Sequence, residues 1–200
     1  MAKSKYSLIL RTCHADFTSY GGGFKWPKKG PVSCPDWDSK PVCGHGLHGL
    51  LWGEGNGELL NWNSGAVWQV VRVLTAEIVE IDKAKVKFPG GTVLYSGTRD
   101  KATAYIYEHG GEGKRIAGLM VTGGDCSTLT GGDYSTLTGG YCSTLTGGYH
   151  STLTGGDYST LTGGDYSTLT GGDCSTLTGG YCSTLTGGYH STLTGGDCST

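Results

Sequence analysis

The chain has 200 residues with a formal net charge of −2, and all 15 basic residues lie at or before Arg115. Residues 1–121 contain 11 acidic residues and therefore balance to +4, whereas residues 122–200 contain six aspartates and no basic residue. Neither part has the strongly basic patch typical of nucleic-acid binding, and no apolar run approaches the roughly 18 residues of a membrane-spanning helix. We therefore expect no nucleic-acid partner and no membrane segment.

The start of the chain bears on the compartment. Its apolar stretch, Leu8-Ile9-Leu10, is too short for the roughly 7–15-residue core of a secretory signal peptide. We predict no classical signal peptide and assign the cytoplasm by default, with the cell surface as the alternative by family analogy. The eight cysteines are then expected to be thiols or metal ligands, because disulfides are rare in reducing compartments.

Residues 1–121 are predicted to form a small globular α+β domain. All five tryptophans lie here, which favours a packed core. Alternating and β-branched runs predict four strands, the last of them broken by Pro-Gly-Gly. These strands cover residues 6–12, 66–74, 77–82 and 85–95.

The end of this domain is predicted to be helical and then flexible. Residues 98–107 fit a short helix with Thr98 as its N-cap and Ala102, Ala104 and Ile106 on its apolar face. The glycines of 110–113 predict a linker. Residues 116–121 are expected to lead into the second part as a cap.

The stretch "CGHGLHG" at 43–49 has the residues that most resemble a chemical site. Cys43, His45 and His48, with Cys34 or with the Cys13-His14 pair, are of the types that bind zinc. Their spacing is irregular and contains no Cys-X-X-Cys pair, so the sequence assigns no metal and no cofactor. Cys34, Cys43, His45 and His48 are retained as the alternative ligands, and the competing interpretation is a tight turn in which His48 is packed or hydrogen-bonded.

Three motifs in this part resemble a bacterial and phage family of unknown function. They are Cys-X-X-Gly-Leu-His at 43–48, "KVKFP" at 85–89 and Gly-X-Arg-X-X-Ala-X-X-Tyr at 97–105. The resemblance implies an architecture and no activity. An enzyme remains the alternative: "YSGT" at 95–98 is faintly similar to ADP-ribosyltransferases, with Glu108 or Glu112 as the carboxylate, and Cys13 or Cys43 could serve a Cys/His hydrolase.

Residues 122–200 are an array of octads. From Gly123 the sequence Gly-Gly-X-X-Ser-Thr-Leu-Thr runs through nine complete copies and stops within a tenth, so we expect a fragment of a longer array. Paired glycines and β-branched threonines oppose helix. Ser-Thr-Leu-Thr alternates with period two, and Gly-Gly suits a corner with positive φ.

The octads therefore predict a mainly β chain that ends in a β-solenoid of eight-residue units, with sixteen residues per coil. Serines and leucines should point inward and threonines outward on both faces. The nonapeptide calcium-binding solenoid does not fit, because its period is nine.

The octads resemble those of bacterial ice nucleation proteins, in the shared "STLT" and in Tyr141, Tyr149, Tyr181 and Tyr189 at the corners. The resemblance implies a β-solenoid whose Thr-X-Thr rows order water or bind an ice surface. The alternative is a structural or self-assembling spacer that associates through its edge or ends. Carried over by position, the water-binding residues are Thr128, Thr130, Thr136, Thr138, Thr144, Thr146, Thr152, Thr154, Thr160, Thr162, Thr168, Thr170, Thr176, Thr178, Thr184, Thr186, Thr192 and Thr194.

Sixteen residues per coil would stack position i on position i+16, and so predict ladders along the edges. Stacking at one coil rise falls within the Cα separation that a disulfide accepts. Asp157 over Asp173 should be an unfavourable pair of like charges. Cys/His columns could supply zinc or copper ligands, although four ligands do not converge on a flat ladder. The predicted ladder residues are Cys126 with Cys142, Cys182 with Cys198, Tyr134 with His150 and Tyr166, and Tyr158 between Cys142 and Cys174.

Overall fold

The computed structural model describes residues 5–19 and 23–200. The chain divides into two compact units, Met1–Gly111 and Glu112–Thr200, which we call the head and the solenoid. The predicted boundary after residue 121 lies ten residues farther along, inside the solenoid. Within the described residues no helix is long and apolar enough to cross a membrane.

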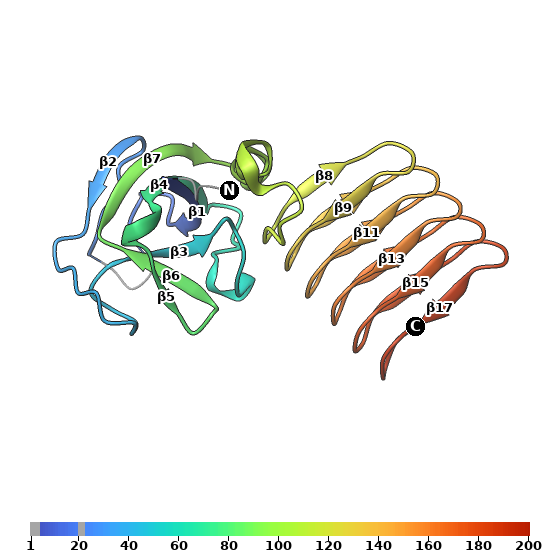
Figure 1. Ribbon diagram of the computed structural model, residues 1–200. Helices are drawn as coiled ribbons and strands as arrows, with labels where there is room; N and C mark the ends of the chain where they lie inside the picture. The colour runs from blue at the N-terminus through green and yellow to red at the C-terminus, as the bar shows by residue number, and fades with distance from the viewer. Residues whose placement is uncertain (1–4, 20–22) are drawn as a thin grey trace. The chain divides into compact units, whose positions relative to one another are not determined.

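The head is built on one seven-stranded antiparallel sheet with the strand order β2-β7-β4-β1-β3-β6-β5 (Figure 1). Its strands are β1 Tyr6–Cys13, β2 Gly30–Ser33, β3 Leu47–Leu51, β4 Val67–Leu74, β5 Val79–Ile81, β6 Lys85–Phe88 and β7 Gly90–Gly97. All four predicted strand regions are confirmed, and Pro89 divides the last of them into two strands. Strands β2 and β3 were not predicted. His48 lies in β3, directly after the bends at residues 41–46, and is half-buried with a hydrogen bond to the backbone of Gly46. The expectation that His48 is packed or hydrogen-bonded therefore holds, although the turn ends before it.

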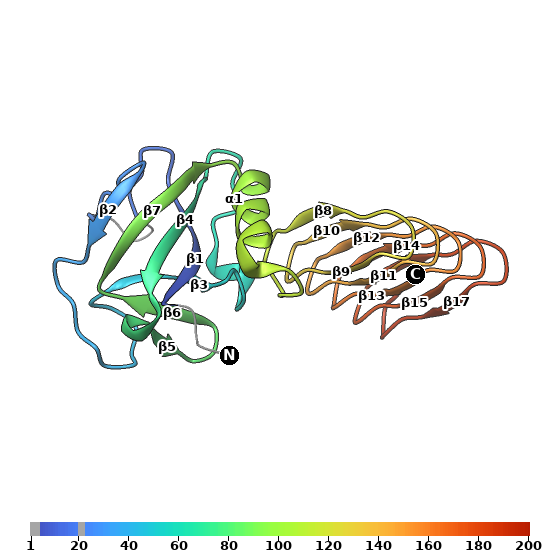
Figure 2. The ribbon, with the colours of Figure 1, turned by 45° about the horizontal axis from the view of Figure 1, so that its top comes forward.

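The α-helix α1, Arg99–Ile106, packs against β1, β4 and β7 (Figure 2). Thr98 is its N-cap residue as predicted, but the Thr98 side chain makes no capping hydrogen bond. A π-helical turn, Tyr107–Gly111, follows the helix. Short 3-10 turns occur at Gly57–Leu59 and Thr75–Glu77. The core of the head is apolar and includes Ile9, Trp26, Val71 and Phe88, each at most 3% exposed.

The solenoid consists of two five-stranded parallel sheets (Figures 1 and 2). One contains β8 Met120–Thr122, β10 Thr136–Thr138, β12 Thr152–Thr154, β14 Thr168–Thr170 and β16 Thr184–Thr186. The other contains β9 Thr128–Thr130, β11 Thr144–Thr146, β13 Thr160–Thr162, β15 Thr176–Thr178 and β17 Thr192–Thr194. Each strand pairs with the strand two octads later, which confirms sixteen residues per coil.

The core of the solenoid is thin and repeats with the octad. Six leucines of the octads are fully buried: Leu137, Leu145, Leu153, Leu161, Leu169 and Leu177. The serine of each octad, from Ser135 to Ser183, is 1% exposed. Full burial of a leucine stabilises by about 1.5–3 kcal/mol, so the two columns of leucines, one from each sheet, contribute much of the apolar stabilisation. Ile116, Ala117 and Leu119 are also fully buried. Amide hydrogen bonds join their segment to the next octad, from Gly118 to Asp133 O and from Gly132 to Ile116 O.

The corners differ from the sequence expectation. Positive φ falls on the residue before each serine, from Cys126 (φ 51°) to Cys198 (φ 64°), and on none of the array glycines. The glycines are needed for close approach instead. A Cβ on Gly164 would lie 2.8 Å from the carbonyl carbon of Gly148 in the preceding coil, and a Cβ on Gly171 would lie 2.7 Å from Cβ of Ser175.

The aspartates stabilise the stacking of the coils. Asp165 Oδ1 accepts the backbone N–H of Tyr181 at 2.8 Å, and Asp125 and Asp133 do the same for the residues sixteen positions later. Asp157 Oδ1 accepts the N–H of Asp173 at 2.9 Å. The predicted stack of like charges is therefore turned into a hydrogen bond between a carboxylate and a main-chain amide.

Candidate functional site

The threonines of the array form straight rows, because parallel pairing in the solenoid has no register shift. Thr136 pairs with Thr152, Thr152 with Thr168, and Thr168 with Thr184, and the Thr-X-Thr partner two residues later follows the same pattern. Neighbouring strands lie about 4.7–4.9 Å apart, and alternate residues along a strand lie about 6.5–7 Å apart. Each sheet therefore presents a two-dimensional grid of hydroxyl and methyl groups.

These threonine side chains face solvent. From Thr152 to Thr194 every row threonine is exposed, while Thr130, Thr136, Thr138 and Thr146 are half-buried. In the described part of the chain, one row hydroxyl makes a hydrogen bond within the protein: Thr184 Oγ1 accepts from Thr200 Oγ1 at 3.5 Å. The remaining hydroxyls are therefore available to water.

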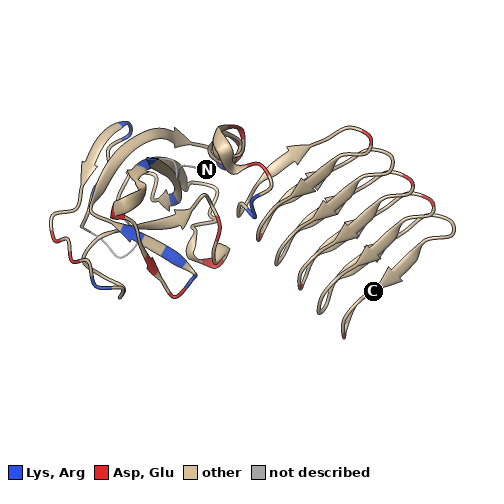
Figure 3. Ribbon diagram, in the orientation of Figure 1, with Lys and Arg blue, Asp and Glu red and all other residues tan. Residues whose placement is uncertain are grey.

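The grids are also uncharged. Figure 3 shows Lys and Arg before strand β8 and acidic residues at the corners of the array. Each strand from β9 to β17 contributes only Thr-Leu-Thr, with leucine pointing inward. From β9 to β17 the outward surface of both sheets thus consists of threonine alone, and Met120 of β8 is the outward neighbour of Thr136 at the start of one sheet.

One edge of the solenoid has the predicted aromatic ladder. The rings of Tyr134 and His150 are stacked with centroids 5.4 Å apart, and those of His150 and Tyr166 with centroids 5.2 Å apart. Tyr149 contacts Tyr134 and Tyr166 edge-on. Residues in positive-φ conformation thus gain ring contacts along this column, which glycine at the same position could not make.

The other column combines tyrosine with cysteine. Tyr158 and Tyr141 are in contact, with ring centroids 5.4 Å apart. The charge of the Cys174 thiolate and a hydrogen bond to that side chain raise the pKa of Tyr158. Tyr158 and Cys174 are thus neighbours sixteen residues apart.

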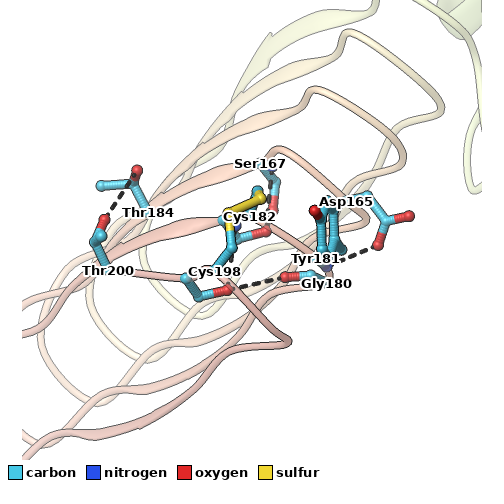
Figure 4. The surroundings of a disulfide bond; sticks show 10 residues. Asp165, Ser167, Gly180, Tyr181, Cys182, Thr184, Cys198 and Thr200 are labelled. Carbon is cyan, nitrogen blue, oxygen red and sulfur yellow. Dashed lines mark hydrogen bonds between the residues drawn. A yellow bond between two sulfur atoms is a disulfide. The ribbon is translucent and has the colours of Figure 1, made fainter.

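The stacked cysteines behave differently in the two columns. Cys182 and Cys198 form a disulfide with their Cα atoms 4.5 Å apart (Figure 4). The expectation that all cysteines are thiols or metal ligands is wrong for this pair, because one coil rise places them at bonding distance. Cys126 and Cys142 are free thiols, and a hydrogen bond to Cys142 raises the pKa of Cys126.

The head residues considered for zinc surround one cavity without forming a metal site. Cys34 donates to Asp36 at 2.9 Å, and His45 Nδ1 lies 3.1 Å from the other oxygen of that carboxylate. Cys43 Sγ accepts from Lys85 Nζ at 3.1 Å, and His48 lies on β3. Among the residues that the structure describes, no three His, Cys, Asp or Glu side chains are grouped so that they could hold a metal ion.

The residues of the alternative enzyme interpretations are only partly brought together. Cys43 lines the same cavity as His48, whereas Cys13 and both glutamates do not line it. Cys13 is buried, and its thiol lies 3.8 Å from the carbonyl oxygen of Val67. Glu108 is exposed in the turn after α1, and Glu112 belongs to the solenoid unit.

Comparison with curated proteins confirms the resemblance to ice nucleation proteins over about half of the chain. The chain is 39% identical over 100 residues to the ice nucleation protein of Xanthomonas campestris pv. translucens, which is 50% of this chain and 6% of that protein. It is 36% identical over 108 residues to that of Pseudomonas fluorescens (54% and 9%) and 40% identical over 105 residues to InaU of Pantoea ananas (51% and 10%).

The chain thus spans a tenth or less of these relatives' length. No family model and no solved structure matches it. The similarity of the head to a family of unknown function stays a prediction. The chain is therefore a repeat protein that ends in a β-solenoid and is similar in sequence, over about half of its length, to ice nucleation proteins.

Proposed function

We propose that the solenoid is a non-enzymatic surface that binds ice or orders water, with the Thr-X-Thr rows as the contact. The observation that carries the proposal is the in-register alignment of exposed threonines whose hydroxyls have almost no partner within the protein. The relatives are named for ice nucleation, and an array with this surface suits the same activity.

The chemistry of the grid supports this assignment. Each hydroxyl can donate one hydrogen bond and accept two, so an ordered water layer can be anchored at every position. Each methyl group limits the directions in which neighbouring waters can bond. Charged side chains would instead organise water around themselves, and the grids contain none.

Rigidity is the second requirement, because a template must hold its spacing. Parallel pairing in register joins each coil to the next, and the aspartates and the edge ladder add hydrogen bonds and ring contacts. β-branched side chains have few χ1 rotamers, which reduces the entropy lost when a threonine is fixed against ordered water.

The proposal is tested by partition of the intact chain into slowly growing ice. The variant replaces Thr152, Thr168 and Thr184, three neighbours in one row, with lysine. The matched control introduces three lysines at the exposed corner residues Tyr141, Tyr181 and Tyr189, which lie outside the strands. We expect the control to enter ice like the unmodified chain and the row variant to enter less.

A structural spacer is the competing function, and the same experiment distinguishes it. A spacer would be excluded from ice in all three forms, while its circular dichroism and melting would be normal. Self-association through the edge or ends is a separate prediction, and sedimentation of the chain over a range of concentrations tests it.

A further inference from the structure

The proposed ice-binding function leaves a large cavity in the head without a role. Its volume is about 540 Å³, within the range of about 300–1,000 Å³ common for small-molecule sites. Trp26, Leu47 and Leu50 contribute apolar lining, and Arg11 and His48 contribute polar atoms. An apolar cavity with a few converging polar groups is the usual form of a ligand site.

Arg11 is the most informative of these residues. It extends from β1, is 7% exposed, and has its guanidinium 3.4 Å from the ring centroid of Trp26. Nη1 donates to Gln69 Oε1 at 3.3 Å and Nη2 donates to the carbonyl oxygen of Thr12 at 2.9 Å. Nε is buried and has no hydrogen-bond partner among the residues that the structure describes.

The charge of Arg11 is also uncompensated. Within the described residues no carboxylate forms an ion pair with it. Burial lowers the pKa of Arg11 to about 9, which still leaves the side chain cationic at neutral pH. A buried cation normally has an anionic partner, because desolvation is otherwise costly. Here the protein supplies stacking and two neutral acceptors instead of a carboxylate.

His48 adds a second unused polar atom beside this cation. Its Nε2 is buried without a partner, and its strand neighbour across the sheet is Lys87. Burial, together with the charges of Lys85, Lys87 and Arg11, lowers the pKa of His48. The nearby carboxylate of Asp36 is already engaged by His45 and Cys34. The lining thus carries two cations, Arg11 and Lys85, and one carboxylate, Asp36, so its net charge is positive.

We propose that the cavity of the head binds a small organic oxyanion. Its phosphate or carboxylate group lies against Arg11 and His48, and its apolar body lies against the lining of Trp26, Leu47 and Leu50. The anion supplies the charge partner that Arg11 lacks among the described residues. A metal cation is disfavoured by the net positive charge of the lining.

Calorimetric titration of the full chain with four probes tests the proposal. Phenyl phosphate and benzoate have an oxyanion and an apolar ring, inorganic phosphate lacks the ring, and benzyl alcohol lacks the charge. We expect phenyl phosphate, benzoate or both to bind with one-to-one stoichiometry. We expect inorganic phosphate, which lacks the ring, to bind at least about tenfold more weakly than phenyl phosphate. Benzyl alcohol, which lacks the charge, should bind at least about tenfold more weakly than the organic anion that binds best.

Two variants locate the site. Arg11→Gln should weaken binding by roughly tenfold or more, because it removes a charge-assisted hydrogen bond. Arg72→Gln is the matched control, since it removes the same charge from an exposed position on β4 outside the cavity. Tryptophan fluorescence shows whether Arg11→Gln is folded. If it is not, His48→Gln, which keeps a polar side chain, replaces it as the variant that locates the site. It should also weaken binding.

Several results would overturn the proposal. The first is that neither organic anion binds the folded chain at millimolar concentration. The second is that inorganic phosphate binds as tightly as phenyl phosphate. The third is that Arg72→Gln weakens binding as much as Arg11→Gln or His48→Gln does. Ice partition of the same variants should be unchanged, which keeps this test separate from that of the threonine rows.

Discussion

A leucine in the middle of the solenoid should be worth far more stability than the equivalent leucine in the last complete octad. Leu161 is fully buried between Leu145 and Leu177 of the neighbouring coils. Leu193 occupies the same octad position on β17 and is 45% exposed. The pair Leu161→Ala and Leu193→Ala therefore changes the same atoms in the same local sequence at different burial.

The expected costs follow from burial. Leu161→Ala removes a fully enclosed side chain, and such changes typically cost about 2–5 kcal/mol. At Leu193 about half of the side chain is already in water, so with a full burial value of about 1.5–3 kcal/mol the loss should be about 1 kcal/mol. We expect the two variants to differ by about 1–4 kcal/mol, with Leu161→Ala the more destabilised.

Hydrogen exchange by mass spectrometry on peptides of the array measures this difference locally, which suits a repeat protein that opens coil by coil. Tryptophan fluorescence during denaturation is the internal control, because all five tryptophans lie in the head. Equal destabilisation by the two variants would refute the reasoning, since it would mean that the leucine column does not form the core.

Three further changes test the corners. Gly164→Ala places a Cβ 2.8 Å from a main-chain carbon of the preceding coil. It should destabilise the solenoid by roughly 1–3 kcal/mol, which would be measured as a lower denaturation midpoint. An unchanged midpoint would mean that the coils are farther apart. Cys182→Ser removes the disulfide to Cys198, which closes a loop of 16 residues and stabilises by up to about 3 kcal/mol. Amide hydrogen exchange should become faster in the last coil. Unchanged exchange there would contradict the disulfide. Asp165→Ala removes the acceptor for the N–H of Tyr181 and should cost about 0.5–1.5 kcal/mol, with faster exchange of that amide, while Asp165→Asn keeps the acceptor and should change little.

The solenoid could be predicted from the sequence because its period fixes its geometry. Once an octad is one strand and one corner, residues sixteen apart must stack, and this placed Cys182 over Cys198 and His150 between two tyrosines. The conformation of the corner could not be predicted in the same way. Paired glycines suggest positive φ, but here they provide room for the neighbouring coil, and the following cysteine, tyrosine or histidine adopts the left-handed conformation.

The head was less predictable because its key contacts join residues far apart in the chain. Strands β2 and β3 are rich in glycine and proline or follow a glycine run, so their sequences resemble loops. The residue types of Cys43, His45 and His48 indicate metal ligands only as an alternative. In the fold, Cys43 contacts Lys85, and His48 lies near the charge of Arg11. The sequence does not indicate that Arg11 lines a cavity. An arginine in an otherwise apolar strand is expected to point outward into solvent.

Ice-crystal shaping tests the central claim most directly. Single crystals would be grown in solutions of the intact chain and of the variant with lysine at Thr152, Thr168 and Thr184, at equal concentration. If the threonine rows bind ice, the intact chain will produce faceted crystals and the lysine variant will produce rounded discs. Rounded discs from the intact chain, or identical facets from both, would contradict the assignment of the rows as the ice-binding surface.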